Sequence, residues 1–221
     1  MITPHPDFWK VFKETNGALS TAEALAIMNI AAQAPINVIG GLHYEFGSFN
    51  GKSAMSAMVG LKGGRFMLVD PIFSDQQVFN KVLKGVFDCN DFNNNKVETI
   101  GVGLTDGYSL DILPTINNVS FLFLDTGSHG GGLPMAEVKL IEDKIVKDGI
   151  VCFHDYKNQF TEVEGAFDYL VGTCKYDPIE INWQEIFDYV AEHNLEEGNN
   201  SWHIYEDLPH PPNFVGALRR K

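Results

Sequence analysis

Residues 44–53 read Tyr-Glu-Phe-Gly-Ser-Phe-Asn-Gly-Lys-Ser, which places the acidic end of an expected strand directly before a glycine-rich turn and the start of a helix. Gly47 and Gly51 allow the backbone to turn sharply and to approach a ligand closely. A helix that begins near Ser53 directs its unpaired amides at the same ligand. The stretch therefore predicts a site for a nucleotide-type cofactor.

Two other interpretations of this stretch are open. A phosphate-binding P-loop has four residues between its glycines, whereas only three separate Gly47 from Gly51. Glu45 would also repel a polyphosphate and would suit a ligand that carries positive charge. The second alternative is a tight strand-to-helix turn that binds no ligand.

Residues 45–53 resemble the first motif of class I S-adenosylmethionine-dependent methyltransferases. Their acid-x-Gly-x-x-x-Gly-x-Ser spacing is most similar to that of the catechol O-methyltransferase-like and small-molecule or sugar O-methyltransferase group, and the order of elements from about Ala18 to Tyr169 extends the resemblance. The sulfonium and ammonium groups of S-adenosylmethionine fit an acidic strand end. The resemblance implies that the turn binds this methyl donor through Glu45, Gly47, Ser48, Phe49, Gly51 and Ser53.

Length and charge narrow the class of protein. At 221 residues the chain is long enough for one sizeable α/β domain. We expect a single domain over residues 1–221, in which residues 1–36 form a polar arm and a helix that packs on the core. The net charge of −13 opposes binding to nucleic acid or to anionic lipid.

Cysteine usage and hydropathy point to a reduced, cytoplasmic setting. The 3 cysteines are widely spaced, so they predict neither a disulfide framework nor a zinc cluster. No apolar run approaches the roughly 18 residues that a membrane span requires. We expect a small-molecule acceptor as the partner and leave a homo-oligomer open.

Apolar and turn-forming segments alternate along the chain as in α/β proteins. Ser20-Thr21-Ala22-Glu23 resembles a capping box and predicts the first helix, which Pro35 ends. The predicted strands cover residues 42–46, 65–70, 97–103, 119–125, 149–155, 178–181 and 201–206, and the further helices cover residues 53–61, 75–87, 134–147, 162–171 and 183–193. The pattern predicts an α/β fold with a doubly wound, mostly parallel sheet. The resemblance implies the seven-stranded, Rossmann-like methyltransferase fold with an antiparallel C-terminal edge strand.

Acids at the strand ends are the next candidates, because ligands of such sheets bind beyond the carboxyl ends of the strands. Asp70 lies 19 residues after Gly51, where its carboxylate can accept hydrogen bonds from both hydroxyls of a ribose. The resemblance assigns it that role, and the alternative is a cap for residues 71–74. Thr105 is a candidate for the adenine side of the donor, and Asp125 is expected to face the donor as well.

Asp125 and Asp155 end neighbouring predicted strands. In the family that the chain resembles, acids at these two positions bind a divalent cation such as Mg²⁺, and the residue after the second acid often supplies another oxygen. Tyr156 stands there in this chain. The alternatives are structural: Asp125 orients a loop, and Asp155 binds neighbouring backbone amides.

His129 and His154 are the candidate bases, and Asp155 completes the predicted catalytic set. Related methyltransferases carry Asp-Gly-x-His after this strand, whereas residues 125–129 read Asp-Thr-Gly-Ser-His and are one residue longer. A surface loop histidine is the alternative for His129. His154 directly precedes Asp155, so side chains that alternate along a strand place one of the two at the pocket edge.

These features together predict an S-adenosylmethionine-dependent methyltransferase that O-methylates a small polar molecule or a sugar. A nicotinamide-dependent oxidoreductase is an alternative enzyme class, but the Gly-x-Gly-x-x-Gly pattern that it uses is absent from residues 45–53. A catalytically decayed cofactor-binding interaction module is a third hypothesis, suggested by the irregular loop at residues 125–132.

Overall fold

The computed structural model describes residues 1–15, 17, 19–35, 42–61, 63–74, 95–102, 107–127, 130–157, 160–195 and 215–221. The helix predicted at 75–87 and the strand predicted at 201–206 lie outside these ranges. Within them, no helix is long and apolar enough to cross a membrane.

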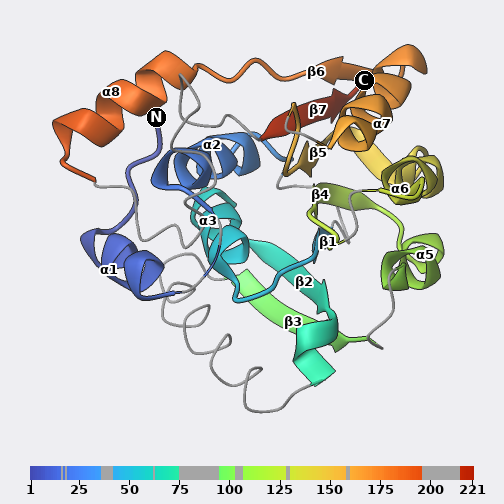
Figure 1. Cartoon of the computed structure of the whole chain (residues 1–221), viewed down its shortest axis with the longest axis horizontal. Coiled ribbons are helices and arrows are strands. Elements are labelled where there is room, and N and C mark those ends of the chain that lie inside the picture. The colour runs from blue at the N-terminus through green and yellow to red at the C-terminus, as the bar shows by residue number, and fades with distance from the viewer. Residues whose placement is uncertain are drawn as a thin grey trace.

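A seven-stranded sheet with the order β3-β2-β1-β4-β5-β7-β6 forms the centre of the molecule (Figure 1). The strands are β1 Leu42–Phe46, β2 Gly64–Asp70, β3 Asn95–Gly101, β4 Val119–Leu124, β5 Ile145–Phe153, β6 Tyr176–Pro178 and β7 Gly216–Arg220. Neighbours from β3 to β5 are parallel, and β7 is antiparallel to both β5 and β6. The doubly wound, mostly parallel sheet with an antiparallel C-terminal strand is thereby confirmed.

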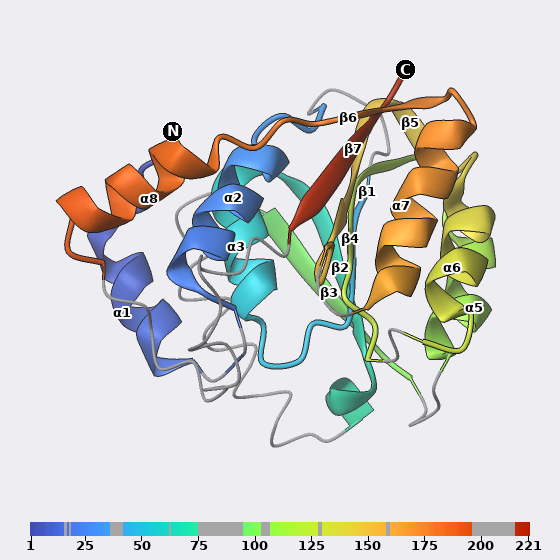
Figure 2. The ribbon, with the colours of Figure 1, turned by 45° about the horizontal axis from the view of Figure 1, so that its top comes forward.

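Helices cover both faces of the sheet (Figure 2). One face carries α2 Thr21–Ala31 and α3 Lys52–Gly60, with α1 Pro6–Glu14 and α8 Trp183–Glu192 beside them. The other face carries α5 Tyr108–Ile112, α6 Leu133–Ile141 and α7 Thr161–Gly172. The described residues also include two short 3₁₀ helices, η1 Pro71–Ser74 and η2 Leu113–Thr115. Because both faces are covered, all of β4 is buried, as its continuous apolar sequence predicts.

The capping box predicted at the start of α2 is present. The Ser20 hydroxyl accepts a hydrogen bond from the Glu23 amide, and Oε2 of Glu23 accepts one from the Ser20 amide at 2.9 Å. Nearly every residue of α2 is buried, so this helix lies inside the layer between the sheet, α3 and α8.

Several predicted boundaries are wrong, among them the strand predicted at 178–181, which lies at 176–178. Residues 6–14 form α1 instead of a polar arm, because a proline at the first helical position is compatible with a helix and Phe8 and Phe12 are buried against the core. The helix predicted at 134–147 ends at Ile141, and Ile145 begins β5. An apolar residue such as Ile145 fits either pattern, and pairing with β4 selects the strand.

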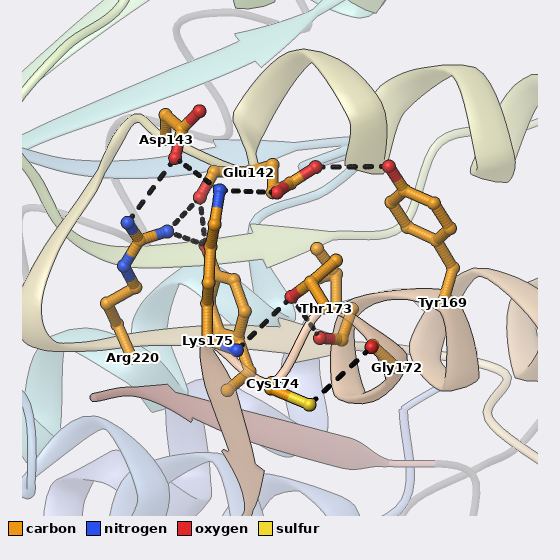
Figure 3. Close-up of polar contacts among 10 residues, drawn as sticks. Glu142, Asp143, Tyr169, Gly172, Thr173, Cys174, Lys175 and Arg220 are labelled. Carbon is orange, nitrogen blue, oxygen red and sulfur yellow. Dashed lines mark hydrogen bonds and ion pairs between the residues drawn. The ribbon is translucent and has the colours of Figure 1, made fainter.

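A polar network anchors the C-terminal strand at the amino end of β5 (Figure 3). Lys175 Nζ lies 2.6 Å from Glu142 Oε1 and 2.9 Å from Asp143 Oδ1. Arg220 of β7 donates to the Glu142 carbonyl oxygen and pairs with Asp143. The network lies at the opposite edge of the sheet from the strand-end acids, so we assign it a structural role.

Candidate cofactor and acceptor site

The β1–α3 turn approaches the end of β4 so closely that only glycine fits at its first position. Gly47 has a φ of 88°, and a Cβ atom there would lie 1.7 Å from the carbonyl oxygen of Asp125. Gly51, with a φ of 81°, precedes the first residue of α3. Both glycines predicted from the sequence are therefore required by the backbone. Between them, Phe49 has a φ of 41° and a side chain that is 56% exposed.

Lys52 shows that this turn is not arranged to bind a polyphosphate. Its side chain is buried, its Nζ donates to the Leu19 carbonyl oxygen at 3.3 Å, and it lies 4.3 Å from the centre of the Phe12 ring. A P-loop lysine extends instead towards the phosphates of its ligand. Lys52 therefore ties α3 to the N-terminal segment, which counts against the P-loop interpretation.

Glu45 is a buried carboxyl group beneath the turn. Its Oε1 accepts a hydrogen bond from the Ser53 hydroxyl at 2.8 Å, and its Oε2 has no hydrogen-bond partner among the described residues. Burial raises the pKa of Glu45 to about 8, and the negative charges of Asp125 and Asp70 add to the rise. Glu45 is therefore largely protonated at neutral pH in the free protein, and a bound cation would favour its ionised form.

Asp70 ends β2 beside the same turn. Its Oδ2 accepts a hydrogen bond from the Phe49 amide at 2.8 Å, and its Oδ1 accepts one from the Ile72 amide at 2.7 Å. The carboxylate thus caps the following 3₁₀ helix, η1, and also holds the glycine turn, which is the β1–α3 turn at residues 47–51, in place. A carboxylate has about four lone-pair sites, so both oxygens can accept a further hydrogen bond. The ribose role predicted for Asp70 is compatible with this geometry.

His154 lies among three carboxyl groups beyond β5. Its Nδ1 lies 3.4 Å from Asp125 Oδ2 and 3.4 Å from Asp155 Oδ2, and its Nε2 lies 3.5 Å from Glu23 Oε1. Burial alone lowers the pKa of His154, but the carboxylates, Asp125 foremost, raise it well above its ordinary value. His154 is therefore an imidazolium in the free protein and has no free lone pair with which to accept a proton.

Asp155 occupies a backbone conformation that aspartate tolerates better than most residues. Its φ is 58°, in the left-handed region, at the point where the chain leaves β5. The side chain is largely buried beside His154. The strand end thus places the predicted pair, His154 and Asp155, at one site with Asp125.

Glu23 is a site residue that sequence reasoning missed. Its position in the capping box explains why the residue type suits a helix start, but the cap uses only Oε2. The other oxygen faces His154. The sequence carries no sign of this contact, because Glu23 and His154 belong to elements far apart in the chain.

Buried polar atoms without a hydrogen-bond partner gather at this edge of the sheet. Folded proteins leave few such atoms unpaired, so a cluster of them indicates a place where a ligand supplies the partners. Among the described residues, those near the carboxyl ends of β1, β2 and β4 are Glu45 Oε2, Ser48 Oγ and the Tyr108 hydroxyl, and the others are Thr21 Oγ1, His43 Nδ1 and Arg219 Nε. Glu23 Oε1 and both ring nitrogens of His154 also lack a hydrogen bond, but they form ion pairs with one another and with Asp125 and Asp155, so a ligand is not needed to pair them.

The structure therefore brings together most of the predicted site residues. Those that lie around the carboxyl ends of the central strands are Glu45, Gly47, Ser48, Phe49, Gly51, Ser53, Asp70, Asp125, His154 and Asp155. Thr105 and His129 fall outside the described residues, so their predicted roles stay predictions.

No protein-family model and no curated protein matches the sequence. Solved structures do match. A protein from Corynebacterium glutamicum has a TM-score of 0.61 at 11% identity, over 99% of this chain and 91% of its own. An O-methyltransferase from Bacillus cereus in complex with SAH has a TM-score of 0.52 at 12% identity, over 81% and 84%.

A third match is the apo TDP-rhamnose 3′-O-methyltransferase of calicheamicin biosynthesis, with a TM-score of 0.52 at 15% identity, over 89% of this chain and 78% of its own. At such identities the likeness concerns the fold alone. The antiparallel β7 beside β5 distinguishes this sheet from the 3-2-1-4-5-6 order of dinucleotide-binding domains. The chain therefore has the fold of the class I methyltransferases.

Proposed function

We propose that the protein is an S-adenosylmethionine-dependent O-methyltransferase that acts on a small polar molecule or a sugar. One observation carries the proposal: on a methyltransferase fold, the buried carboxyl groups of Glu45 and Asp70 lie beside the glycine turn and keep acceptor positions that the described residues leave unused. Glu45 and Asp70 flank the turn, and Asp125 lies against it. These carboxyl groups favour a donor that carries a sulfonium and an ammonium over a polyphosphate, because a bound cation stabilises the ionised form of Glu45 and a bound anion does not.

The proposed donor site has two halves. Glu45, Ser48 and Ser53, with the backbone at Gly47 and Gly51, hold the amino-acid half. Asp70 accepts hydrogen bonds from the ribose, and Thr105 contributes on the adenine side. Phe49 is the exposed aromatic side chain at the mouth of the turn, and Asp125 faces the reacting end.

Methyl transfer then requires mainly alignment of donor and acceptor, because S-adenosylmethionine supplies an already activated methyl group. A hydroxyl acceptor must also lose its proton. His154 carries a proton in the free protein, so it positions the carboxylates of Asp125 and Asp155 through its charge. We assign the proton-accepting role to Asp155, with His129 as the second candidate.

A divalent cation is a separate proposal. Asp125, His154 and Asp155 each offer a ligand atom, all within 4.8 Å of one another. These residues can bind a cation once it displaces the proton of His154, because the imidazolium otherwise neutralises the charges of both carboxylates. The likeness to solved structures does not support a cation. Titration of chelator-treated protein with Mg²⁺, followed by calorimetry, tests whether these groups bind it.

Asp70→Asn is expected to weaken binding of S-adenosylhomocysteine about tenfold or more, because the ribose loses hydrogen bonds to a charged group. Calorimetric titration of the purified variant measures the effect. Asp111→Asn is the matched control, since Asp111 is an exposed carboxylate on α5. Equal affinities in wild type and Asp70→Asn would remove Asp70 from the donor site.

The same titration separates the enzyme classes. We expect wild-type protein to bind S-adenosylhomocysteine, and we expect neither NADH nor ATP to compete with it. Competition by NADH would favour the oxidoreductase hypothesis, and competition by ATP would favour a P-loop. Transfer of a labelled methyl group to hydroxyl acceptors then distinguishes an active enzyme from a decayed binding module.

A further inference from the structure

Tyr108 carries a buried hydroxyl that nothing in the described part of the protein uses. The residue begins α5 directly after Gly107, which has a φ of 119°. Its ring packs in an apolar cluster that also contains Phe46, Val69 and Leu124. The side chain is 7% exposed, and the hydroxyl finds no hydrogen-bond partner among the described residues. The packed ring fixes the hydroxyl in place.

The surroundings of this hydroxyl are those of the proposed donor site. Burial raises the pKa of Tyr108 most, and the charges of Asp70, Glu137, Asp125 and Glu45 raise it further. Three of these four carboxyl groups flank the glycine turn. The fourth, Glu137, instead accepts a hydrogen bond from the Ser109 hydroxyl at 2.5 Å. Tyr108 therefore stays protonated and is available as a hydrogen-bond donor.

We propose that Tyr108 donates a hydrogen bond to the nucleoside half of the bound methyl donor. The proposal rests on the proposed function and adds a residue that the sequence did not indicate. Tyr108 lies in the cluster on the α5–α7 face of the sheet, whereas α3, which carries Ser53, lies on the opposite face (Figure 2). Asp70 at the end of β2 lies between these faces, so a donor whose ribose contacts Asp70 can extend its nucleoside towards Tyr108.

A buried hydroxyl without a partner destabilises the free protein, and an acceptor atom on a ligand removes that cost. Removal of the hydroxyl alone should therefore weaken ligand binding without harming the free fold. If Tyr108 served only the fold, removal of its hydroxyl would lower the stability of the free protein and leave ligand binding unchanged.

Tyr108→Phe is the test, with S-adenosylhomocysteine and 5′-methylthioadenosine as probes. The second probe keeps the nucleoside and lacks the amino-acid half. We expect calorimetry to show that both probes bind about three- to tenfold more weakly than to wild type. Thermal unfolding of the free variant should occur at the wild-type Tm or above it.

Tyr44→Phe is the matched control. Tyr44 packs in the same apolar cluster, but the charges that act on its hydroxyl are those of Arg65 and Glu98. Its removal should leave the affinity for both probes unchanged.

Each other outcome decides against the proposal. Unchanged affinity in Tyr108→Phe would show that the hydroxyl does not contact the ligand, and a clearly lowered Tm would show that it serves the fold. A loss confined to S-adenosylhomocysteine would place the contact on the amino-acid half. If the wild-type protein binds neither probe, the proposed function itself is wrong. If the wild-type protein binds the probes and Tyr108→Phe binds them equally well, only the role of Tyr108 is wrong.

Discussion

Gly47→Ala is expected to destabilise the protein by about 3 kcal/mol or more and to remove measurable donor binding. The new Cβ atom would lie 1.7 Å from the carbonyl oxygen of Asp125. Because that oxygen belongs to the backbone, no side-chain rotation relieves the overlap, and β1 must separate from β4 where the donor binds. Urea unfolding measures the stability, and calorimetry with S-adenosylhomocysteine measures the binding.

Gly63→Ala is the control for backbone strain alone. Gly63 also has a positive φ, 119°, but a Cβ atom there would meet nothing within 4 Å. We expect a loss of roughly 1–2 kcal/mol and unchanged donor affinity. If the two variants lose equal stability and Gly47→Ala still binds the donor, the close approach of the turn to β4 is not the reason for glycine at this position.

Glu45→Gln is expected to change how the stability of the free protein depends on pH. The pKa of Glu45 is raised from 4.5 to about 8 in the folded state, chiefly by burial. The folded protein therefore retains the proton more strongly than the unfolded chain. The stability due to this group is fully present below pH 4.5 and is lost as pH rises through about 8. The whole change amounts to at most roughly 5 kcal/mol.

Urea unfolding at a series of pH values measures this effect. Relative to wild type, Glu45→Gln should gain stability progressively as the pH rises from 4.5 towards 8. Glu192→Gln, at an exposed carboxylate on α8, should follow the wild-type curve. Parallel curves for wild type and Glu45→Gln would show that Glu45 is not held protonated by its surroundings.

Local patterns were sufficient to predict the parts of the fold that depend on nearby residues. β1 begins and ends where predicted, and β4 follows its continuous apolar run. The capping box fixed the start of α2, and residues 45–53 predicted the glycine turn because a strand, a turn and a helix follow one another there. These features are encoded in short segments, so sequence patterns detect them.

Long-range packing determines the parts that were missed. β7, which reads Gly-Ala-Leu-Arg-Arg, lacks an apolar strand pattern and forms because it pairs with both β5 and β6. Glu23 reaches His154 from a helix near the N-terminus, and Tyr108 enters the site from a segment that resembles no part of the methyltransferase motif. Contacts between distant segments leave no local trace in the sequence.

The central claim is that the turn between β1 and α3 binds a methyl donor of the S-adenosyl type. A crystal structure of the protein soaked with S-adenosylhomocysteine tests it most directly. We predict that the ligand lies over Gly47 and Gly51, with its ribose hydroxyls on Asp70 and its ammonium group near Glu45. Crystals in which saturating ligand leaves this turn empty, or binds at another place, would contradict the account.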